Sequence, residues 1–232
     1  MGMPKAFDKW PEKYDQWFDT PIGRLIRQYE SELTVKMLEP VHGETILDAG
    51  CGTGVFTLDL LSAGARVVGL ELSLPMAHRA KWKLRQFSFQ MVQGDMTCLP
   101  FAHGAFDKTT SLTALEFIDD ARTAISELFR VTKPGGRILV ATLNSLSPWA
   151  RRREAAGKQG HPLFRHAIFR SPDQVRALSP LPCVIKTAIH FQKDDNPDEA
   201  KEVEKEGQRE SSATGAFLAA CWQKPACWQK PL

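Results

Sequence analysis

The chain has 232 residues, of which 43% are hydrophobic and 25% charged, and a formal net charge of +3. These values are typical of an ordinary globular domain, and the charge is too small to indicate a nucleic-acid-binding protein. No apolar run approaches the roughly 18 residues of a membrane-spanning helix, and residues 1–5 show no secretory signal, so we expect a cytoplasmic protein. The five cysteines are scattered without a Cys-x-x-Cys pair, which predicts neither a disulfide framework nor a metal site.

The first part of the chain is rich in aromatic residues but shows no regular period. We interpret residues 7–20 as an aromatic lid in which Tyr14 and Trp17 cover a ligand, and simple packing of an N-terminal flap is the alternative. Apolar residues then recur at helical spacing, which predicts an amphipathic helix over residues 21–38. Thr20 precedes it as a suitable N-cap, with a proline in the first turn.

A glycine-rich turn follows the first predicted strand, which begins at Ile46 and ends in the acid Asp48, and leads to a helix expected from about Thr53. Such an abrupt turn needs residues without a Cβ, and the N-terminus of a helix offers N–H groups to a ligand. Asp48 is informative because an acid at the end of a buried strand is costly unless it meets a cation or hydrogen-bond donors. A pyrophosphate gains nothing from this carboxylate, whereas a ligand that carries an ammonium and a sulfonium does.

Two further strand ends also carry acids. The second strand ends in Glu71, which lies 21 residues after Gly50, close to the ~20-residue spacing at which an acid binds ribose hydroxyls. The third strand, residues 87–92, is followed by Asp95. Because the carboxyl ends of parallel strands meet at one edge of an open sheet, we expect Asp48, Glu71 and Asp95 to surround a single ligand.

The rest of the chain predicts more strands and an irregular segment. Strands are expected over residues 67–71, 106–112, 137–142, 184–191 and 214–222, with helices after Ser73 and over residues 120–131. Periodicity fails over residues 144–182, which contain Arg151, Arg152 and Arg153, and we interpret this segment as a substrate cap. Residues 193–210 are highly charged and predict an exposed helix or loop. The sequence Ala-Cys-Trp-Gln-Lys-Pro at residues 220–225 recurs at once, so residues 226–232 are expected to form a tail.

Several of these stretches resemble the motifs of class I S-adenosylmethionine-dependent methyltransferases. The pattern Asp-x-Gly-x-Gly-x-Gly at residues 48–54 is similar to the first motif of that family. Gly-Asp-Met at residues 94–96, followed by Leu-Pro-Phe at 99–101, resembles its third cofactor motif, and residues 128–136 resemble its connection to the fifth strand. The resemblance spans residues 7–142 and is closest to small-molecule enzymes of the ubiquinone and menaquinone type.

The resemblance implies a fold and a cofactor. The expected fold class is α/β, a Rossmann-like doubly wound sheet of seven mostly parallel strands with an antiparallel edge strand and helices on both faces. A single domain over residues 1–225, with a cofactor-binding core at residues 44–142, would bind S-adenosylmethionine. Asp48 would anchor its amine, Glu71 its ribose and Asp95 its adenine. The predicted cofactor-binding residues are Tyr14, Asp48, Gly50, Cys51, Gly52, Glu71, Leu72, Met76, Asp95, Met96, Leu112 and Thr113.

The catalytic groups are less well specified. Transfer of a methyl group from a sulfonium depends mainly on alignment, and a general base is needed only when the acceptor arrives protonated. The candidates are Glu116, His161 and His166, each of which also has a plainer explanation as a helix cap or an ordinary polar side chain.

The absence of one known motif limits the class of methyl acceptor. Residues 111–114 read Ser-Leu-Thr-Ala rather than the Asn/Asp-Pro-Pro-aromatic motif of enzymes that methylate nucleic-acid bases, so a small-molecule acceptor is favoured. An RNA or protein methyltransferase, a non-catalytic cofactor-binding protein and a nicotinamide oxidoreductase are the alternatives. We expect a monomer or a homodimer without a bound metal.

Overall fold

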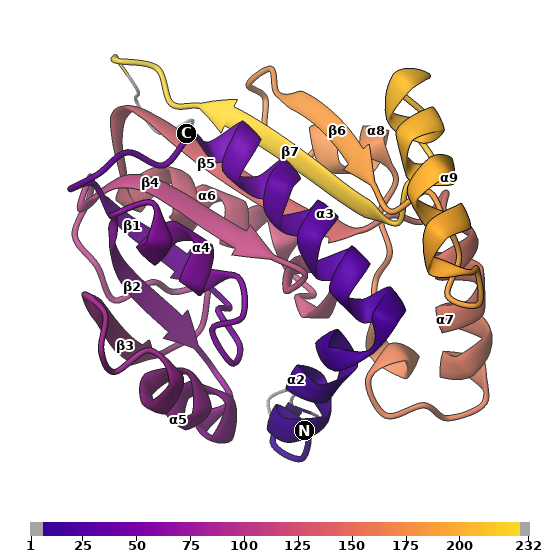
Figure 1. The fold of residues 1–232 in the computed structure, drawn as a ribbon. Coiled ribbons are helices and arrows are strands. Elements are labelled where there is room, and N and C mark those ends of the chain that lie inside the picture. Colours follow the sequence, from indigo (N-terminus) through magenta and orange to yellow (C-terminus); the bar gives the residue numbers. More distant parts are fainter. Residues whose placement is uncertain (1–6, 228–232) are drawn as a thin grey trace.

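The structure, a computed structural model, describes residues 7–227 and centres on a seven-stranded sheet with helices on both faces (Figure 1). The predicted α/β class is therefore confirmed. Residues 1–6 of the predicted domain and residues 228–232 of the predicted tail lie outside the described part.

The strands are β1 Thr45–Ala49, β2 Arg66–Glu71, β3 Phe89–Gln93, β4 Phe106–Leu112, β5 Thr132–Leu143, β6 Val184–Ala188 and β7 Phe217–Gln223. The helices are α2 Pro11–Asp19, α3 Pro21–Leu38, α4 Thr57–Ser62, α5 Leu74–Lys83, α6 Ala121–Val131, α7 Pro148–Lys158, α8 Pro172–Arg176 and α9 Pro197–Arg209, with 3-10 turns η1 Leu115–Phe117 and η2 Phe164–His166.

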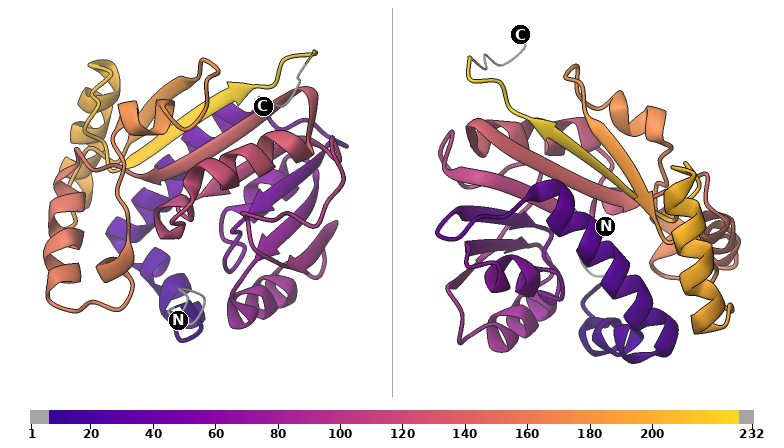
Figure 2. Two further views of the ribbon diagram at one scale, coloured as in Figure 1. Left: turned by 180° about the vertical axis from the view of Figure 1, so that it is seen from behind. Right: turned by 45° about the horizontal axis from the view of Figure 1, so that its top comes forward.

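The sheet has the order β3-β2-β1-β4-β5-β7-β6. Strands β1 to β5 are parallel, while β7 is antiparallel to both of its neighbours, so the antiparallel strand lies one place inside the edge and β6 is outermost. Helices α3 and α4 cover one face and α6 covers the other (Figure 2). Because both faces are covered, β1 is apolar and almost fully buried rather than alternating in polarity.

The point at which the strand order reverses positions the site. Strand β1 has β2 on one side and β4 on the other, and the chain has crossed the sheet between them. In open α/β sheets, ligands bind in the crevice beyond the carboxyl ends of the strands at this point. The predicted helix over residues 21–38 is confirmed as α3, and the Thr20 side chain accepts a hydrogen bond from Gly23 N at its start.

The first crossover helix begins later than the sequence predicted. It starts at Thr57 rather than at about Thr53, and only six residues are helical. Gly54 has φ +77°, in the left-handed region, so a right-handed helix cannot run through it. The loop between β1 and α4 is therefore longer than expected. More backbone groups of this loop lie at the carboxyl ends of the strands, where ligands bind in such sheets.

Two segments predicted to be irregular are helical. The aromatic segment forms α2. The sequence did contain a pattern that indicates this helix: Trp17 and Phe18 lie three and four residues after Tyr14, so the three side chains share one helix face. The predicted cap contains α7, η2 and α8. Helix α7 lacks an apolar stripe, since only Trp149 and Ala150 of its side chains are buried, so periodicity could not reveal it.

The turn predicted before the fifth strand belongs to the sheet. Strand β5 begins at Thr132, and Gly135 N donates to Lys224 O while Lys224 N donates to Gly136 O. The first copy of the duplicated hexapeptide thus extends β7, and its Trp222 is fully buried. The charged segment after β6 is α9, an exposed helix that packs on α3 and β6 along one edge.

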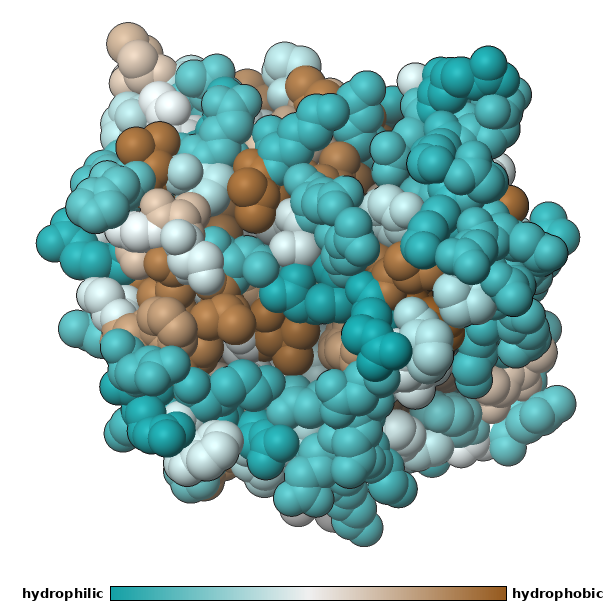
Figure 3. Space-filling model, in the orientation of Figure 1, coloured by the Kyte–Doolittle hydropathy of each residue, from teal (hydrophilic) through white to brown (hydrophobic). Residues whose placement is uncertain are grey.

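The face in Figure 3 is mainly hydrophilic, with hydrophobic patches near α4 and between α3 and α9. No helix within residues 7–227 is long and apolar enough to cross a membrane.

Candidate functional site

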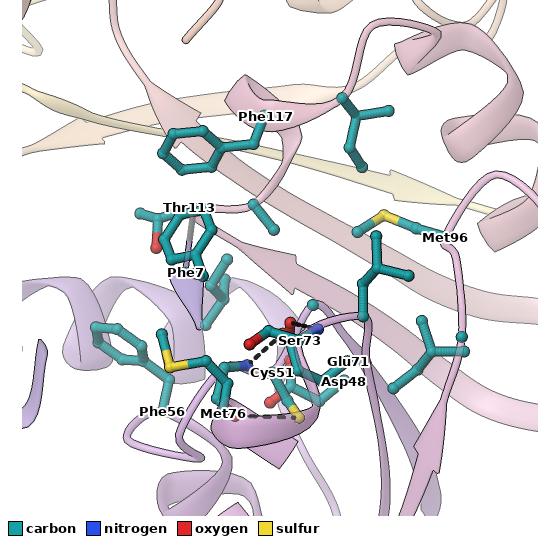
Figure 4. A pocket seen from close by; sticks show the side chains of 18 of the residues that line it. Phe7, Asp48, Cys51, Phe56, Glu71, Ser73, Met76, Met96, Thr113 and Phe117 are labelled. Atoms are coloured by element: carbon teal, nitrogen blue, oxygen red, sulfur yellow. Dashed lines mark hydrogen bonds between the residues drawn. The ribbon is translucent and has the colours of Figure 1, made fainter. Parts of the chain in front are cut away.

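A pocket opens beyond the carboxyl ends of β1, β2 and β4, at the point where the strand order reverses (Figure 4). All twelve predicted cofactor-binding residues line it, although they come from five separate parts of the chain. The sequence did not predict a cofactor-binding role for the other lining residues, which are Phe7, Val55, Phe56, Leu70, Ser73, Gly94, Ala114, Phe117 and Ile118.

The glycine-rich loop forms one wall of the pocket. Gly50 has φ +74°, and a Cβ on it would lie 2.6 Å from the Cβ of Ala114. Gly52 has φ +56°, but nothing lies within 4 Å of the position of its absent Cβ, so the backbone is open to a ligand there. Leu70 O accepts from Gly50 N and Cys51 N at 2.7 and 3.1 Å, which fixes the loop to β2.

Asp48 stands at the base of this wall and is 2% exposed. Its Oδ2 accepts a hydrogen bond of 2.6 Å from Thr57 Oγ1, at the start of α4. Burial raises the pKa of Asp48 to about 6, and the nearby carboxylate of Glu71 adds to the shift. A cationic group bound beside it would offset both effects, so the site favours a positively charged ligand.

Glu71 is held by backbone donors on both oxygens. Oε2 accepts from Gly52 N at 3.0 Å, and Oε1 accepts from Ser73 N at 2.8 Å. Burial raises its pKa despite these hydrogen bonds. A carboxylate oxygen can accept more than one hydrogen bond, so this oriented carboxylate can still accept from the hydroxyls of a ligand.

The third acid, Asp95, is more exposed. Its Oδ1 accepts from Thr97 N and Thr97 Oγ1 at 2.8 and 2.7 Å.

Ser73 occupies the N-cap position of α5 as predicted, but its hydroxyl does not cap the helix. It donates instead to Asp8 Oδ1 at 2.7 Å, which ties α5 to the segment before α2.

The N-terminal segment covers the pocket with different residues from those expected. Tyr14 lines the pocket, but Trp17 does not and packs into the core beside α3, with Lys193 Nζ 5.4 Å from its ring centroid. Phe7 takes part in its place and meets Phe117 edge to face, with the ring centroids 4.8 Å apart (Figure 4). Rings from opposite sides of the pocket therefore close over it.

Asp15 connects this cover to the loop and to α5. Its carboxylate accepts from Thr53 Oγ1 at 2.6 Å, from Arg79 Nε at 2.9 Å and from Lys83 Nζ at 2.8 Å. Burial alone would raise its pKa, but the hydrogen bonds from Lys83, Thr53 and Arg79 together lower it. The ionised form therefore holds α2 against the glycine-rich wall.

The three predicted catalytic candidates have different surroundings. Glu116 is fully buried in η1, its Oε2 accepts from Thr142 Oγ1 at 3.0 Å, and burial raises its pKa to about 7. The ring of His161 stacks on Phe164 at 4.5 Å, and its Nδ1 accepts from a nearby backbone N–H. His166 is exposed on η2, and none of the three candidates lines the pocket.

Two charged residues interact electrostatically with Glu116; sequence reasoning missed Glu30 and named Arg153 only as part of the arginine run at residues 151–153. Glu30 lies on the apolar side of α3, is 7% exposed, and burial raises its pKa to about 8. Arg153 of α7 lies over the Trp149 ring, 5.0 Å from its centroid, and burial lowers its pKa. The signal for Glu30 was its place four residues after Ile26, within the apolar stripe of the predicted helix.

Within residues 7–227, no group of three or more His, Cys, Asp or Glu side chains is arranged to hold a metal ion. All five cysteines are free thiols.

Comparison with known proteins identifies the core. Residues 47–140 match the methyltransferase domain family. The chain is 38% identical over 147 residues to a demethylmenaquinone methyltransferase of Beutenbergia cavernae, covering 62% of this chain and 58% of that protein. It is 39% identical over 145 residues to a malonyl-[acyl-carrier protein] O-methyltransferase of Erwinia billingiae, covering 62% of this chain and 55% of that one. The chain thus spans little more than half the length of these relatives.

Solved structures show the same fold at lower identity. A SAM-dependent methyltransferase from Thermotoga maritima superposes with a TM-score of 0.71 at 20% identity and covers 96% of this chain and 100% of that chain. Geranyl diphosphate C-methyltransferase from Streptomyces coelicolor gives a TM-score of 0.62 at 22% identity, covering 84% of this chain and 78% of that chain.

Proposed function

We propose that this chain, whose residues 47–140 match the methyltransferase domain family, is a class I S-adenosylmethionine-dependent methyltransferase that transfers a methyl group to a small-molecule acceptor. The observation that carries the proposal is the set of three acids, Asp48, Glu71 and Asp95, which follow successive strands and line one pocket. A pyrophosphate cofactor would be repelled by them, whereas a cationic nucleoside is attracted.

The residues of the pocket fit S-adenosylmethionine. Asp48 suits its ammonium group, and Glu71 suits the two ribose hydroxyls because backbone donors already fix the carboxylate. The space beside Gly52 admits the ligand close to the backbone, and Met76 offers an apolar surface to the adenine. When bound, the cofactor supplies a methyl group on a sulfonium. The task of the chain is then to align the acceptor and to exclude water.

The choice of acceptor class rests on the relatives and on the charge of the chain. Similarity to the demethylmenaquinone and malonyl-[acyl-carrier protein] enzymes favours a small or carrier-linked acceptor. A net charge of +3 gives little attraction for nucleic acid. Five free thiols fit a reducing compartment such as the cytoplasm.

Calorimetry with S-adenosylhomocysteine, the demethylated cofactor, tests the cofactor site. We expect Asp48→Asn and Glu71→Gln each to weaken binding by roughly tenfold to a hundredfold, the effect of losing one charge-assisted contact. Glu199→Gln, on the exposed side of α9, is the matched control and should bind as the unaltered protein does. Unchanged affinity in both pocket variants would contradict the proposal.

Labelled methyl transfer then tests the acceptor class. With cell extract divided into small-molecule, protein and RNA fractions, we expect label in the small-molecule fraction. Label confined to protein or RNA would indicate the macromolecular alternative, and no transfer to any fraction would favour a non-catalytic protein.

A further inference from the structure

The two edges of the sheet differ in how they are protected. Strand β3 is outermost on the side of β2 (Figure 1), and residues 86–93, which contain it, carry neither a charged side chain nor a proline. Strand β6, at the other edge, has the same length but carries the exposed Lys186, and Pro182 precedes it. Charged side chains and prolines keep a foreign strand from pairing with an edge, so β6 has this protection and β3 lacks it.

The pairing of β3 leaves backbone groups on its outer side. Ser88 O accepts from Val67 N at 3.0 Å. Gly94 N donates to Glu71 O at 3.1 Å, so the even-numbered residues of this stretch turn their backbone groups toward β2. Strand residues alternate in direction, and the N–H and C=O of Met91 therefore point away from β2. No other strand within residues 7–227 pairs there, so Met91 offers a donor and an acceptor to a further strand.

The helix beside this edge has an unbalanced positive charge. Helix α5 packs on β3, and the two elements with their connection contain no Asp or Glu. Of the four Lys and Arg side chains in this stretch, Arg79 and Lys83 share Asp15 at 2.9 and 2.8 Å. Lys81 and Arg85 are exposed and form no ion pair within the described part of the chain. The surface next to β3 is therefore positive and favours an acidic partner.

An exposed tryptophan lies on this positive surface. Trp82 of α5 is 62% exposed, and Arg85 Cζ lies 4.7 Å from its ring centroid. Leu74, eight residues earlier on the same side of α5, is 46% exposed. Tryptophan and arginine are among the residues that most often carry the binding energy of a protein interface. Trp82 thus supplies an apolar anchor beside the free cations.

These features favour an extended polypeptide over other partners. A lipid surface would leave the backbone groups of Met91 without partners, which is costly in hydrocarbon. Two free cations give a weak hold on nucleic acid, whose affinity rises with each phosphate that a protein neutralises. A second copy of the chain, paired through β3 in a continuous antiparallel sheet, would place two positive α5 helices on the same face of that sheet, where they repel each other.

We propose that β3 and the exposed side of α5 form a docking surface for an extended acidic segment of a partner protein. The segment adds to the sheet as a further strand and pairs with the backbone of Met91. Its carboxylates meet Lys81 and Arg85, and an apolar side chain packs on Trp82. None of these four residues is among those that line the cofactor pocket, so docking does not depend on the function proposed above.

A fluorescently labelled peptide of alternating glutamate and valine tests the surface. Its glutamates share one face of a strand, as α5 lies on one face of β3. We expect saturable binding by fluorescence anisotropy, which salt reduces and which falls at least about tenfold when lysine replaces glutamate. Single-stranded RNA and vesicles of anionic lipid, added as competitors, should not displace the peptide.

Two modified peptides test the addition of a strand. One carries N-methyl groups on its glutamates, and the other carries them on its valines. Only one edge of an added strand pairs with β3, and the residues on that edge are either all glutamates or all valines. One modified peptide should therefore bind at least about tenfold more weakly than the other. Equal affinities of the two would overturn the proposal.

Variants of the chain identify the groups responsible. Met91→Pro removes the outward N–H, a change that edge strands tolerate, and should weaken binding by about tenfold or more. Trp82→Ala should have a similar effect, while Arg85→Gln should weaken binding by about twofold to fivefold. Arg151→Gln changes an exposed arginine of α7 and is the matched control, which should bind the peptide as the unaltered protein does.

Circular dichroism and urea unfolding establish that each variant is folded. If the peptide does not bind, or binds equally to Met91→Pro, Trp82→Ala and the unaltered protein, the docking surface is overturned. Displacement by RNA or by vesicles, or a protein dimer that Met91→Pro dissociates, would assign the surface to a different partner and also overturn it. A failure of the unaltered protein to bind S-adenosylhomocysteine bears only on the proposed function.

Discussion

The pocket and the buried charged region of Glu30, Glu116 and Arg153, which lines no part of the pocket, satisfy their acids to different degrees. On the cofactor wall of the pocket, Glu71 accepts backbone hydrogen bonds on both oxygens. In the buried charged region, Glu116 accepts from Thr142 on Oε2, but its Oε1 has no hydrogen-bond partner. Burial raises the pKa of both acids, but only Glu71 has donors on both oxygens.

The difference shows how each region is built. The cofactor wall is made of backbone and short connections within one continuous core, so its geometry is fixed before any ligand arrives. The buried charged region is made of side chains from α3, η1 and α7, which only the tertiary fold brings together. Polar groups left unsatisfied there lower stability.

The largest effect is expected where the cofactor wall has no free space. Gly50→Val combines a left-handed φ of +74° with a Cβ placed 2.6 Å from Ala114, so we expect the affinity for S-adenosylhomocysteine to fall more than about a hundredfold. Gly43→Val is the matched control, because Gly43 has φ +83° with nothing within 4 Å of its Cβ position. Calorimetry on both variants separates the clash from the backbone strain, and equal affinities would contradict this account of the wall.

A pH-dependent effect is expected in the buried charged region. Burial raises the pKa of Glu30 to about 8, above its ordinary value of 4.5, so the folded state binds a proton that the unfolded state has released between these values. Stability is therefore highest at low pH and falls as pH rises through about 8. Glu30→Gln should remove this fall and stabilise the protein at about pH 9 by roughly 2 to 5 kcal/mol.

Urea unfolding at about pH 5 and about pH 9 measures this difference. Glu32→Gln, on the exposed side of α3, should keep the pH dependence of the unaltered protein. A Glu30→Gln variant whose stability still falls between these values would show that Glu30 does not carry a raised pKa.

The same contrast explains what the sequence could predict. The cofactor wall is local, since Asp48, the glycines and Glu71 follow strand ends at regular spacing, and all twelve predicted residues lie around one pocket. The loop before α4 was mistaken for helix because φ values are not visible in a glycine pattern.

The buried charged region could not be predicted in the same way. Glu30 and Arg153 are 123 positions apart in the sequence and interact only because the tertiary fold brings α3 and α7 together. Their one local signal was a charged residue four positions after an apolar one, Ile26 before Glu30 and Trp149 before Arg153. This spacing indicates that a charged side chain lies on the buried face of a helix, but it does not identify the residue with which that side chain interacts.

The smallest effect is expected at Asp15, which joins the cover to the cofactor wall. Asp15→Asn keeps an oxygen for Thr53 but loses the charge that Arg79 and Lys83 share, and these partly exposed ion pairs contribute about 1 to 2 kcal/mol together. We expect amide hydrogens of α2 to exchange roughly 5- to 30-fold faster, with S-adenosylhomocysteine bound only a few-fold more weakly.

Hydrogen exchange on Asp15→Asn, with the exposed Asp19→Asn of the same helix as control, shows whether α2 is held as a lid by the wall or by its own packing. Unchanged exchange in Asp15→Asn would mean that Phe7, Tyr14 and Phe18 hold the helix in place through their ring contacts alone. The cover would then be held mainly from the η1 side of the pocket, because Phe7 packs on Phe117 of η1.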